Sequence, residues 1–205
     1  MNNILIKVEN LVKTFGGLVA LNDCSLEIKD KAITGIIGPN GSGKTTLFNV
    51  ITGNLKPDTG KVFYNGVEIT NEESHDLFHL GVLRTFQIAH EFSNMTVIEN
   101  LMVVPGNQKG EKLLYSLMNS QKIKKEDELI KDKAMEVLKF LKIEHLKNER
   151  AGNLSGGQKK LLELARTMMV DAKIVFLDEV GAGVNKTLLR DISDSILKLN
   201  QDKGY

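Results

Sequence analysis

Residues 38–45 of this 205-residue chain have the types and spacing of a phosphate-binding loop. They read Gly-Pro-Asn-Gly-Ser-Gly-Lys-Thr, which fits the pattern Gly-x-x-x-x-Gly-Lys-Ser/Thr. Glycines let the backbone curl so that successive N–H groups point at phosphate oxygens, and a helix that begins there directs its positive end at the same charge. The residues that we expect around a nucleoside triphosphate are Gly38, Pro39, Asn40, Gly41, Ser42, Gly43, Lys44, Thr45 and Thr46.

The last residues of this pattern carry its chemistry. Lys44 would supply a mobile positive charge for the β- and γ-phosphates, and the Thr45 hydroxyl can ligate Mg²⁺. The alternative is a purely structural glycine turn. The apolar run before the loop and the helical pattern after it favour the phosphate loop, as the motif requires a strand and a helix on its two sides.

Two adjacent carboxylates follow another apolar run. Residues 174–177 read Ile-Val-Phe-Leu and lead directly into Asp178 and Glu179. A buried strand cannot keep two carboxylates inside, so we expect both to emerge at its carboxyl end, where open parallel sheets bind ligands. Asp178 would then hold Mg²⁺, and Glu179 would orient or deprotonate the attacking water. Helix capping is the alternative, and the phosphate loop favours the metal and base.

The elements that must position these residues begin with β structure. Alternating apolar residues over 4–8 and 24–28 predict strands, and the mostly apolar run 32–37 predicts a strand buried on both faces. A helix is expected over 44–52, before Gly53. Asn65-Gly66 between two short β-favouring runs predicts a hairpin.

Helical patterns dominate the middle of the chain, from about residue 90 to 150. One apolar stripe is formed by Ile130, Ala134, Val137, Leu138 and Leu141, and the charged segment 122–133 is typical of a solvated helix face. After residue 152 we expect a helix to about Met169, the strand 174–177 and a last helix from about Lys186. This order predicts an α/β fold with a mostly parallel sheet, an antiparallel β part and an inserted helical lobe.

Composition excludes several classes of protein. Lys and Arg total 27 against 26 Asp and Glu, so the net charge of +1 predicts no nucleic-acid partner. The single cysteine, Cys24, cannot form an internal disulfide and fits a reducing cytosol. No apolar run approaches the ~20 residues of a membrane span, and no signal peptide is visible. We therefore expect a cytoplasmic chain.

A second helix N-terminus that could bind an anion is predicted at Leu154-Ser155-Gly156-Gly157-Gln158, where a serine cap and two glycines begin a helix. The order of phosphate loop, this pentapeptide, and an apolar run ending in Asp-Glu resembles the ATP-binding cassette (ABC) family. The resemblance covers essentially the whole chain. It implies a single P-loop NTPase domain over residues 1–205, with an α/β core of 1–89 and 151–205 and a helical subdomain of 90–150.

The resemblance also assigns roles. In that family two cassettes pair head to tail, so Ser155, Gly156, Gly157 and Gln158 would contact ATP that a partner cassette holds, with Ser155 and Gly157 at its γ-phosphate. Gln87 would link Mg²⁺ and the γ-phosphate to the helical lobe. Phe15 would lie against the adenine, although a lone Phe after a strand is otherwise a core residue. The segment 183–185 would touch the opposite cassette.

Two departures from the family pattern stand out. Val180 replaces the usual proline after Asp-Glu, for which we expect a small effect. All four histidines precede Glu179, so the last core strand and the family's switch histidine are absent. We hypothesise a shortened chain that binds ATP and is impaired in hydrolysis.

A narrower resemblance points to the ATP-binding subunits of bacterial branched-chain amino acid importers. It is carried by Arg84-Thr85-Phe86-Gln87, by residues 95–100 and 158–166, and by Gly181-Ala182-Gly183-Val184-Asn185. That branch also includes importers of urea and short amides. The resemblance implies an ATPase with ATP and Mg²⁺ as cofactors, located at the inner face of the cell membrane. Its partners would be a second cassette, integral membrane permease subunits and an extracytoplasmic solute-binding protein.

Two further readings remain open. The first is a soluble ABC-type ATPase that acts on ribosomes or DNA, although such relatives usually carry a long coiled-coil insertion or two cassettes in one chain. The second is a nucleotide-binding module without turnover, which Glu179 argues against and the missing histidine argues for.

Overall fold

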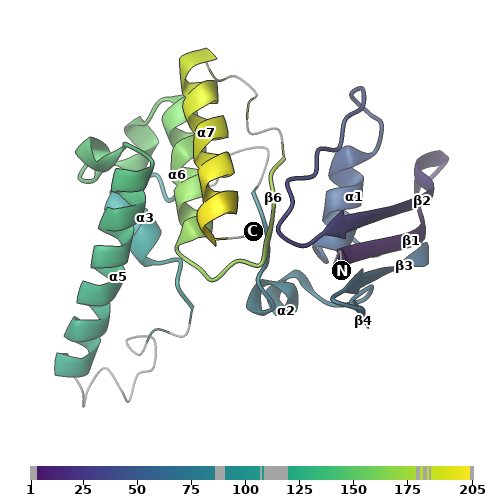
Figure 1. Cartoon of the computed structure of the whole chain (residues 1–205), viewed down its shortest axis with the longest axis horizontal. Coiled ribbons are helices and arrows are strands. Elements are labelled where there is room, and N and C mark those ends of the chain that lie inside the picture. The colour runs from purple at the N-terminus through teal and green to yellow at the C-terminus, as the bar shows by residue number, and fades with distance from the viewer. Residues whose placement is uncertain are drawn as a thin grey trace. The chain divides into compact units, whose positions relative to one another are not determined.

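The computed structural model describes residues 4–85, 91–106, 108, 120–178, 181, 184 and 186–203. The chain divides into two compact units. The first unit contains Met1–Arg84, Ala172–Asp178 and Leu197–Tyr205, and the second contains Thr85–Asp171 and Glu179–Ile196. Figure 1 follows the chain through both by colour.

An antiparallel sheet forms most of the first unit. Its strands are β1 (Ile4–Phe15), β2 (Leu18–Lys29), β3 (Thr59–Tyr64) and β4 (Val67–Glu68), in the order β2-β1-β3-β4. Helix α1 (Lys44–Ile51) packs on this sheet (Figure 1). The buried apolar side chains that join helix and sheet include Ile6, Val8, Leu11, Leu47, Val50, Ile51 and Val62. The predicted helix after the phosphate loop is confirmed, and so are the strands predicted over 4–8 and 24–28. Burial alternates over 24–28 but not in the first strand, where both Leu5 and Ile6 are buried.

The predicted hairpin is also present. Asn65 and Gly66 both have positive φ angles, 48° and 79°, which a type I′ turn requires at its two central positions. The turn joins β3 to β4 with Tyr64 opposite Val67. Local turn chemistry therefore sets the register of this pair.

A parallel pair forms the other sheet of the first unit. After α2 (Ser74–His79), β5 (Val82–Arg84) pairs with β6 (Ile174–Phe176), and Arg84 lies opposite Phe176. Both strands therefore end at the same edge, with Arg84 and Asp178 near it. This is the parallel element that the order of runs predicts.

The run 32–37 differs from the prediction. The sequence favours a strand buried on both faces, but the structure gives these residues no strand, and all except the half-buried Ile36 are exposed. Ile37 is 97% exposed. An apolar run becomes a strand only where neighbouring backbones accept and donate its hydrogen bonds, and no described strand pairs with this one.

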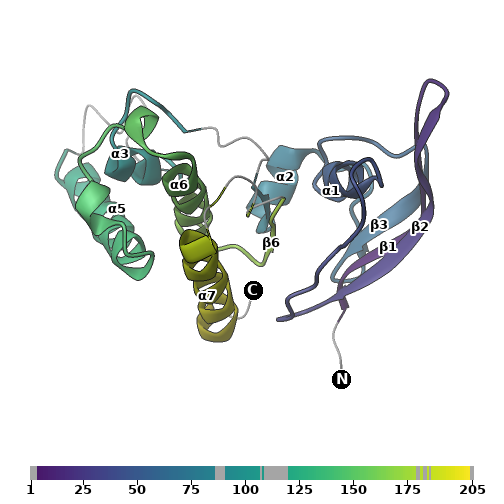
Figure 2. The same ribbon diagram turned by 90° about the horizontal axis from the view of Figure 1, so that it is seen from above.

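Helices make up the second unit. They are α3 (Val97–Met102), α5 (Ser120–Phe140), α6 (Gly156–Met168) and most of α7 (Lys186–Lys203), with short 3₁₀ turns at Glu144–Leu146 and Ala151–Asn153. Helices α3, α5 and α6 pack on one another (Figure 2). Among the described residues, none of the helices combines the length and hydropathy that crossing a membrane requires.

The predicted apolar stripe on α5 is confirmed. Ala134, Val137, Leu138 and Leu141 are buried, Ile130 is half-buried, and most of the charged segment 122–133 is exposed. The 3.6-residue period of the stripe thus decides which face of the helix meets α3 and α6.

Two leucines of α5 provide a matched test of this packing. Leu138 is fully buried and Leu129 is 70% exposed. We expect Leu138→Ala to lower the free energy of unfolding by about 2–5 kcal/mol, because it removes buried methyl groups and leaves a cavity. Leu129→Ala should change it by less than about 0.5 kcal/mol. Urea denaturation followed by far-UV circular dichroism measures both, and equal effects would contradict the assigned face.

Candidate functional site

The loop 38–43 curls around the side chain of Lys44. The Lys44 ammonium donates hydrogen bonds to the carbonyl oxygens of Gly38 and Pro39, both at 2.8 Å. A further bond runs from the Ser42 N–H to the Pro39 carbonyl at 3.2 Å. The predicted phosphate-loop residues therefore form one compact cradle, with the lysine folded onto it.

Gly43 fixes the junction between this loop and α1. Its φ angle is +89°, and a Cβ at this position would lie 2.4 Å from the carbonyl oxygen of Ala20. Only glycine accommodates both the left-handed backbone and the close approach. Gly43 is also the N-cap of α1, and no side chain of the cap residue occupies the first N–H groups. That arrangement suits a helix end that receives an anion.

Asp178 lies two residues after the end of β6 and is buried, which the sequence did not predict. Asp178 thus lies at the carboxyl end of the strand, as predicted, but its side chain is buried there because Arg84 supplies a counter-charge. An Arg84 guanidinium nitrogen lies 2.9 Å from Asp178 Oδ2, and the two side chains are 6% and 5% exposed. The other terminal nitrogen of Arg84 donates to the Asn49 side-chain oxygen. Since Asn49 belongs to α1, this network joins the carboxylate to the helix of the phosphate loop.

The donors in the first unit suit a magnesium ion. Thr45 presents an exposed hydroxyl in the first turn of α1, and Asp178 presents a carboxylate. Oxygen donors of these two kinds are what Mg²⁺ takes beside phosphate oxygens. The predicted catalytic residues Gln87 and Glu179 lie outside the described residues, and their roles stay predictions.

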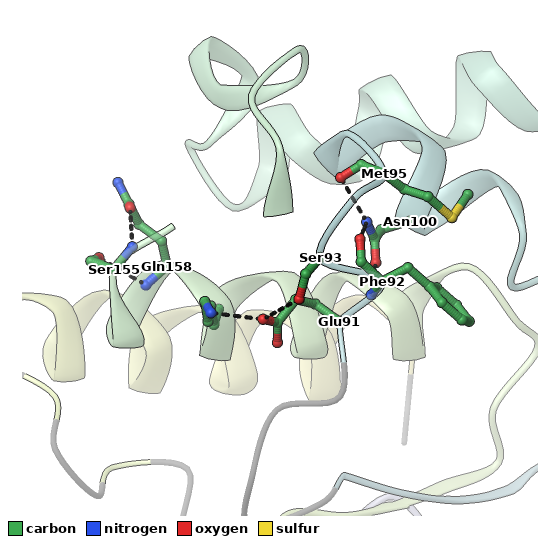
Figure 3. A network of polar contacts seen from close by, with 8 residues as sticks. Glu91, Phe92, Ser93, Met95, Asn100, Ser155 and Gln158 are labelled. Atoms are coloured by element: carbon green, nitrogen blue, oxygen red, sulfur yellow. Dashed lines mark hydrogen bonds and ion pairs between the residues drawn. The ribbon is translucent and has the colours of Figure 1, made fainter. Parts of the chain in front are cut away.

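Ser155 caps α6, as its sequence predicts. The Gln158 N–H donates to Ser155 Oγ at 3.4 Å, and the Ser155 N–H donates to Gln158 Oε1 at 2.9 Å, so the two residues form a capping box (Figure 3). Ser155 and Gly156 are exposed, while Gly157 packs near α7. A Cβ on Gly157 would lie 2.2 Å from a methyl carbon of Leu188.

An ion pair fastens α6 to the segment that follows residue 90. Lys159 Nζ lies 2.7 Å from Glu91 Oε1, and the Ser93 hydroxyl donates to the same oxygen at 3.2 Å. Figure 3 shows Glu91 and Ser93 beside the start of α6. Burial is the largest single influence on the pKa of Glu91 and raises it, but the hydrogen bonds from Lys159, from the Glu91 backbone and from Ser93, together with the charge of Lys159, outweigh burial and lower the pKa. The Glu91 carboxylate therefore stays ionised at neutral pH.

Asn100 holds the next part of that segment. It is fully buried and accepts a hydrogen bond from the Phe92 N–H at 2.8 Å. Its amide nitrogen donates to the carbonyls of Phe92 and Met95 at 3.1 and 3.4 Å (Figure 3). It also donates to the carbonyl of Thr96 at 2.9 Å. One side chain thus adds to the backbone hydrogen bonds that Ser93 and Met95 accept from Gly152 and Ala151.

Phe15 ends β1 and is 48% exposed, with Lys13 Nζ 5.8 Å from its ring centroid. Asp58 fixes this strand end. One of its oxygens accepts from Lys13 Nζ at 2.8 Å, and the other accepts from the Thr14 N–H and hydroxyl, both at 2.7 Å. An exposed aromatic ring on a fixed strand end fits the predicted contact with a base.

Sequence reasoning missed the residues that hold the site together. Arg84, Asn49, Asp58 and the pair Glu91–Lys159 make contacts between segments far apart in the chain. The sequence offered one indication of these residues, which is that they lie in or beside motifs. Arg84 is the first residue of the Arg-Thr-Phe-Gln motif, and Glu91 and Lys159 lie next to other motifs. Of the predicted contact segment 183–185, only Val184 lies within the described residues, and it is half-buried.

Comparison with known proteins supports a common origin for these motifs. Residues 21–182 match the family described as ABC transporter. A relative from Archaeoglobus fulgidus, named probable branched-chain amino acid transport ATP-binding protein LivG, is 45% identical over 96% of this chain and 76% of its own length. BraF of Pseudomonas aeruginosa, named a high-affinity branched-chain amino acid transport ATP-binding protein, is 35% identical over 98% of this chain and 79% of its own.

Solved structures agree in fold. The ADP conformation of MJ1267, an ATP-binding cassette of an ABC transporter, superposes with a TM-score of 0.80 at 44% identity, over 98% of this chain and 78% of that one. The dimeric structure of MJ0796, a bacterial ABC transporter cassette, gives a TM-score of 0.78 at 26% identity, over 98% and 84%. These similarities support the predicted α/β P-loop fold.

The Asp58 contacts predict a pH-dependent stability. Hydrogen bonds from Lys13 and Thr14 lower the pKa of Asp58 from 3.8 to about 2. A carboxylate with a lowered pKa stabilises the fold above its unfolded pKa, and this contribution is lost as the pH falls through the folded value. We expect Asp58→Asn to lower the thermal midpoint at neutral pH, and the difference from the unmodified chain to shrink between pH 4 and pH 2.

Thermal unfolding of both proteins across this pH range measures the effect. Asp127→Asn, at an exposed position of α5, is the control. A difference that stays constant from neutral to acid pH would show that the contacts act without the charge of Asp58.

Proposed function

This chain belongs to the ABC transporter family, and we propose that it is the ATP-hydrolysing subunit that powers an importer of branched-chain amino acids. One observation carries the nucleotide part of this proposal. The cradle around Lys44 opens α1, and the same helix is joined through Asn49 and Arg84 to the buried carboxylate of Asp178. The cargo part rests on relatives of 45% and 35% identity that are named for branched-chain amino acid transport.

The chemistry follows from these groups. The loop N–H groups and the start of α1 would hold the phosphates of ATP, and Lys44 would exchange its carbonyl partners for β- and γ-phosphate oxygens. Mg²⁺, when bound beside Thr45 and Asp178, would neutralise charge on the phosphates. Glu179 would orient the water that attacks the γ-phosphorus in line, with Gln87 beside it. Catalysis would consist mainly of positioning and charge stabilisation.

The exposed start of α6 points to the first partner. The start of α6 exposes Ser155 and Gly156, and we propose that it closes over ATP on a second cassette. The dimeric structure of MJ0796, a cassette of this fold, supports pairing in general. Membrane permease subunits would form the path for the solute. We also propose an extracytoplasmic solute-binding protein and a peripheral location at the inner face of the membrane.

Lys44 provides the first test of nucleotide chemistry. Lys44→Ala should abolish measurable ATP binding and lower hydrolysis by about 100-fold or more, because it removes a positioned charge from the phosphates. Lys56→Ala changes an exposed lysine of the same unit and should leave both unchanged. Equilibrium binding of a fluorescent ATP analogue and phosphate release measure the two steps. Equal ATP turnover in Lys44→Ala and the unmodified chain would exclude this site.

Glu179→Gln provides the test of partners, because loss of the expected base should trap the ATP-bound pair of cassettes. Affinity capture from detergent-solubilised membranes should recover a polytopic membrane subunit and a second cassette. Recovery of ribosomal or DNA-bound proteins without a membrane protein would favour the soluble ATPase instead. The unmodified complex in proteoliposomes should then take up leucine with ATP, and uptake of urea or a short amide in its place would contradict the cargo.

A further inference from the structure

We propose that Arg84 is a positioning residue that orients Asp178 for Mg²⁺ and couples it to the phosphate-loop helix through Asn49. The inference rests on the proposed function, since it concerns the carboxylate that would hold the metal there. It assigns a role to a side chain that none of the predicted motifs contains as a ligand or a base.

The guanidinium of Arg84 binds two partners through its two terminal nitrogens. One terminal nitrogen of Arg84 reaches Asp178 Oδ2 at 2.9 Å, and the other donates to the Asn49 side-chain oxygen on α1. A guanidinium carries donors in a rigid fork, so both partners are held in a fixed relation to each other. A lysine ammonium keeps the charge but is a point donor on a flexible stem.

The surroundings keep this network in place. The ring of Phe48, on α1, lies against the guanidinium, with its centroid 6.0 Å from the Arg84 Cζ atom. The same ring also contacts Phe176, with 5.3 Å between the two ring centroids. Backbone pairing between β5 and β6 sets Arg84 opposite Phe176, two residues before Asp178. Both charges are almost fully buried, and separating such a pair is strongly unfavourable.

The orientation of the carboxylate follows from this arrangement. With Oδ2 bonded to Arg84, rotation about the last side-chain bond of Asp178 is restricted, so the direction of its other oxygen is set. Partners that orient a metal-binding carboxylate typically contribute about 10–100-fold to metal affinity. Asn49 adds a second effect, because it places the carboxylate relative to α1, whose first turn carries Thr45.

The test separates metal affinity from nucleotide affinity in the full chain. Binding of the fluorescent analogue TNP-ATP is measured with EDTA, and Mn²⁺ binding to the nucleotide complex is measured by electron paramagnetic resonance. Arg84→Lys should lower the Mn²⁺ affinity by about 10-fold or more and change the affinity for TNP-ATP in EDTA by less than about 2-fold. Asn49→Ala keeps the ion pair and should lower the Mn²⁺ affinity by about 3-fold.

Arg190→Lys, at an exposed position of α7, is the matched control and should change neither affinity. Unchanged Mn²⁺ affinity in both Arg84→Lys and Asn49→Ala would overturn the inference. An equal fall in nucleotide and metal affinity would also overturn it, because it would show a merely structural role. Failure of the unmodified chain to bind TNP-ATP would overturn the proposed function itself. If Arg84→Lys does not fold, the Mn²⁺ affinity of Asn49→Ala decides whether the inference holds.

Discussion

The buried ion pair of Arg84 and Asp178 is the constraint on which the first unit depends. It lies where the parallel strands β5 and β6 end, and it reaches α1 through Asn49. Three segments that are distant in sequence are thus fixed by one guanidinium. Because each charge is desolvated, the pair is stable only while all three segments keep their places. A carboxylate can be buried beside an anion-binding loop only with such a counter-charge.

In the second unit, buried and partly buried polar contacts hold an irregular segment in place. Residues 91–96 form no regular element, and they are held by the Lys159–Glu91 pair and by the four hydrogen bonds of Asn100. The capping box of Ser155 and Gln158 meanwhile fixes the first turn of α6. The segment after the predicted glutamine loop and the helix of the pentapeptide are therefore fastened to each other. A displacement of the segment 91–96 would therefore displace the start of α6, and the reverse also holds.

Local features of this chain were predictable, and contacts between distant segments were not. The Asn65-Gly66 turn, the start of α1 at a glycine and the apolar stripe of α5 all follow from neighbouring residues. The burial of Asp178 depends on Arg84, 94 positions away, and the run 32–37 needs partner strands that its own residues cannot specify. The phosphate-loop cradle was predicted from its motif, whereas the network behind it was not. The roles of Gln87 and Glu179 stay predictions.

The hydrogen bonds of Lys44 have a consequence for which anions the loop selects. Its ammonium is already satisfied in part by the carbonyls of Gly38 and Pro39. An incoming anion must therefore compete with the protein's own backbone for this cation. A small monoanion offers too little to displace two good acceptors, whereas a triphosphate offers several oxygens and several charges at once. The two carbonyls are thus internal competitors for the lysine. We therefore expect the loop to favour highly charged phosphate esters over simple monoanions, without any steric filter.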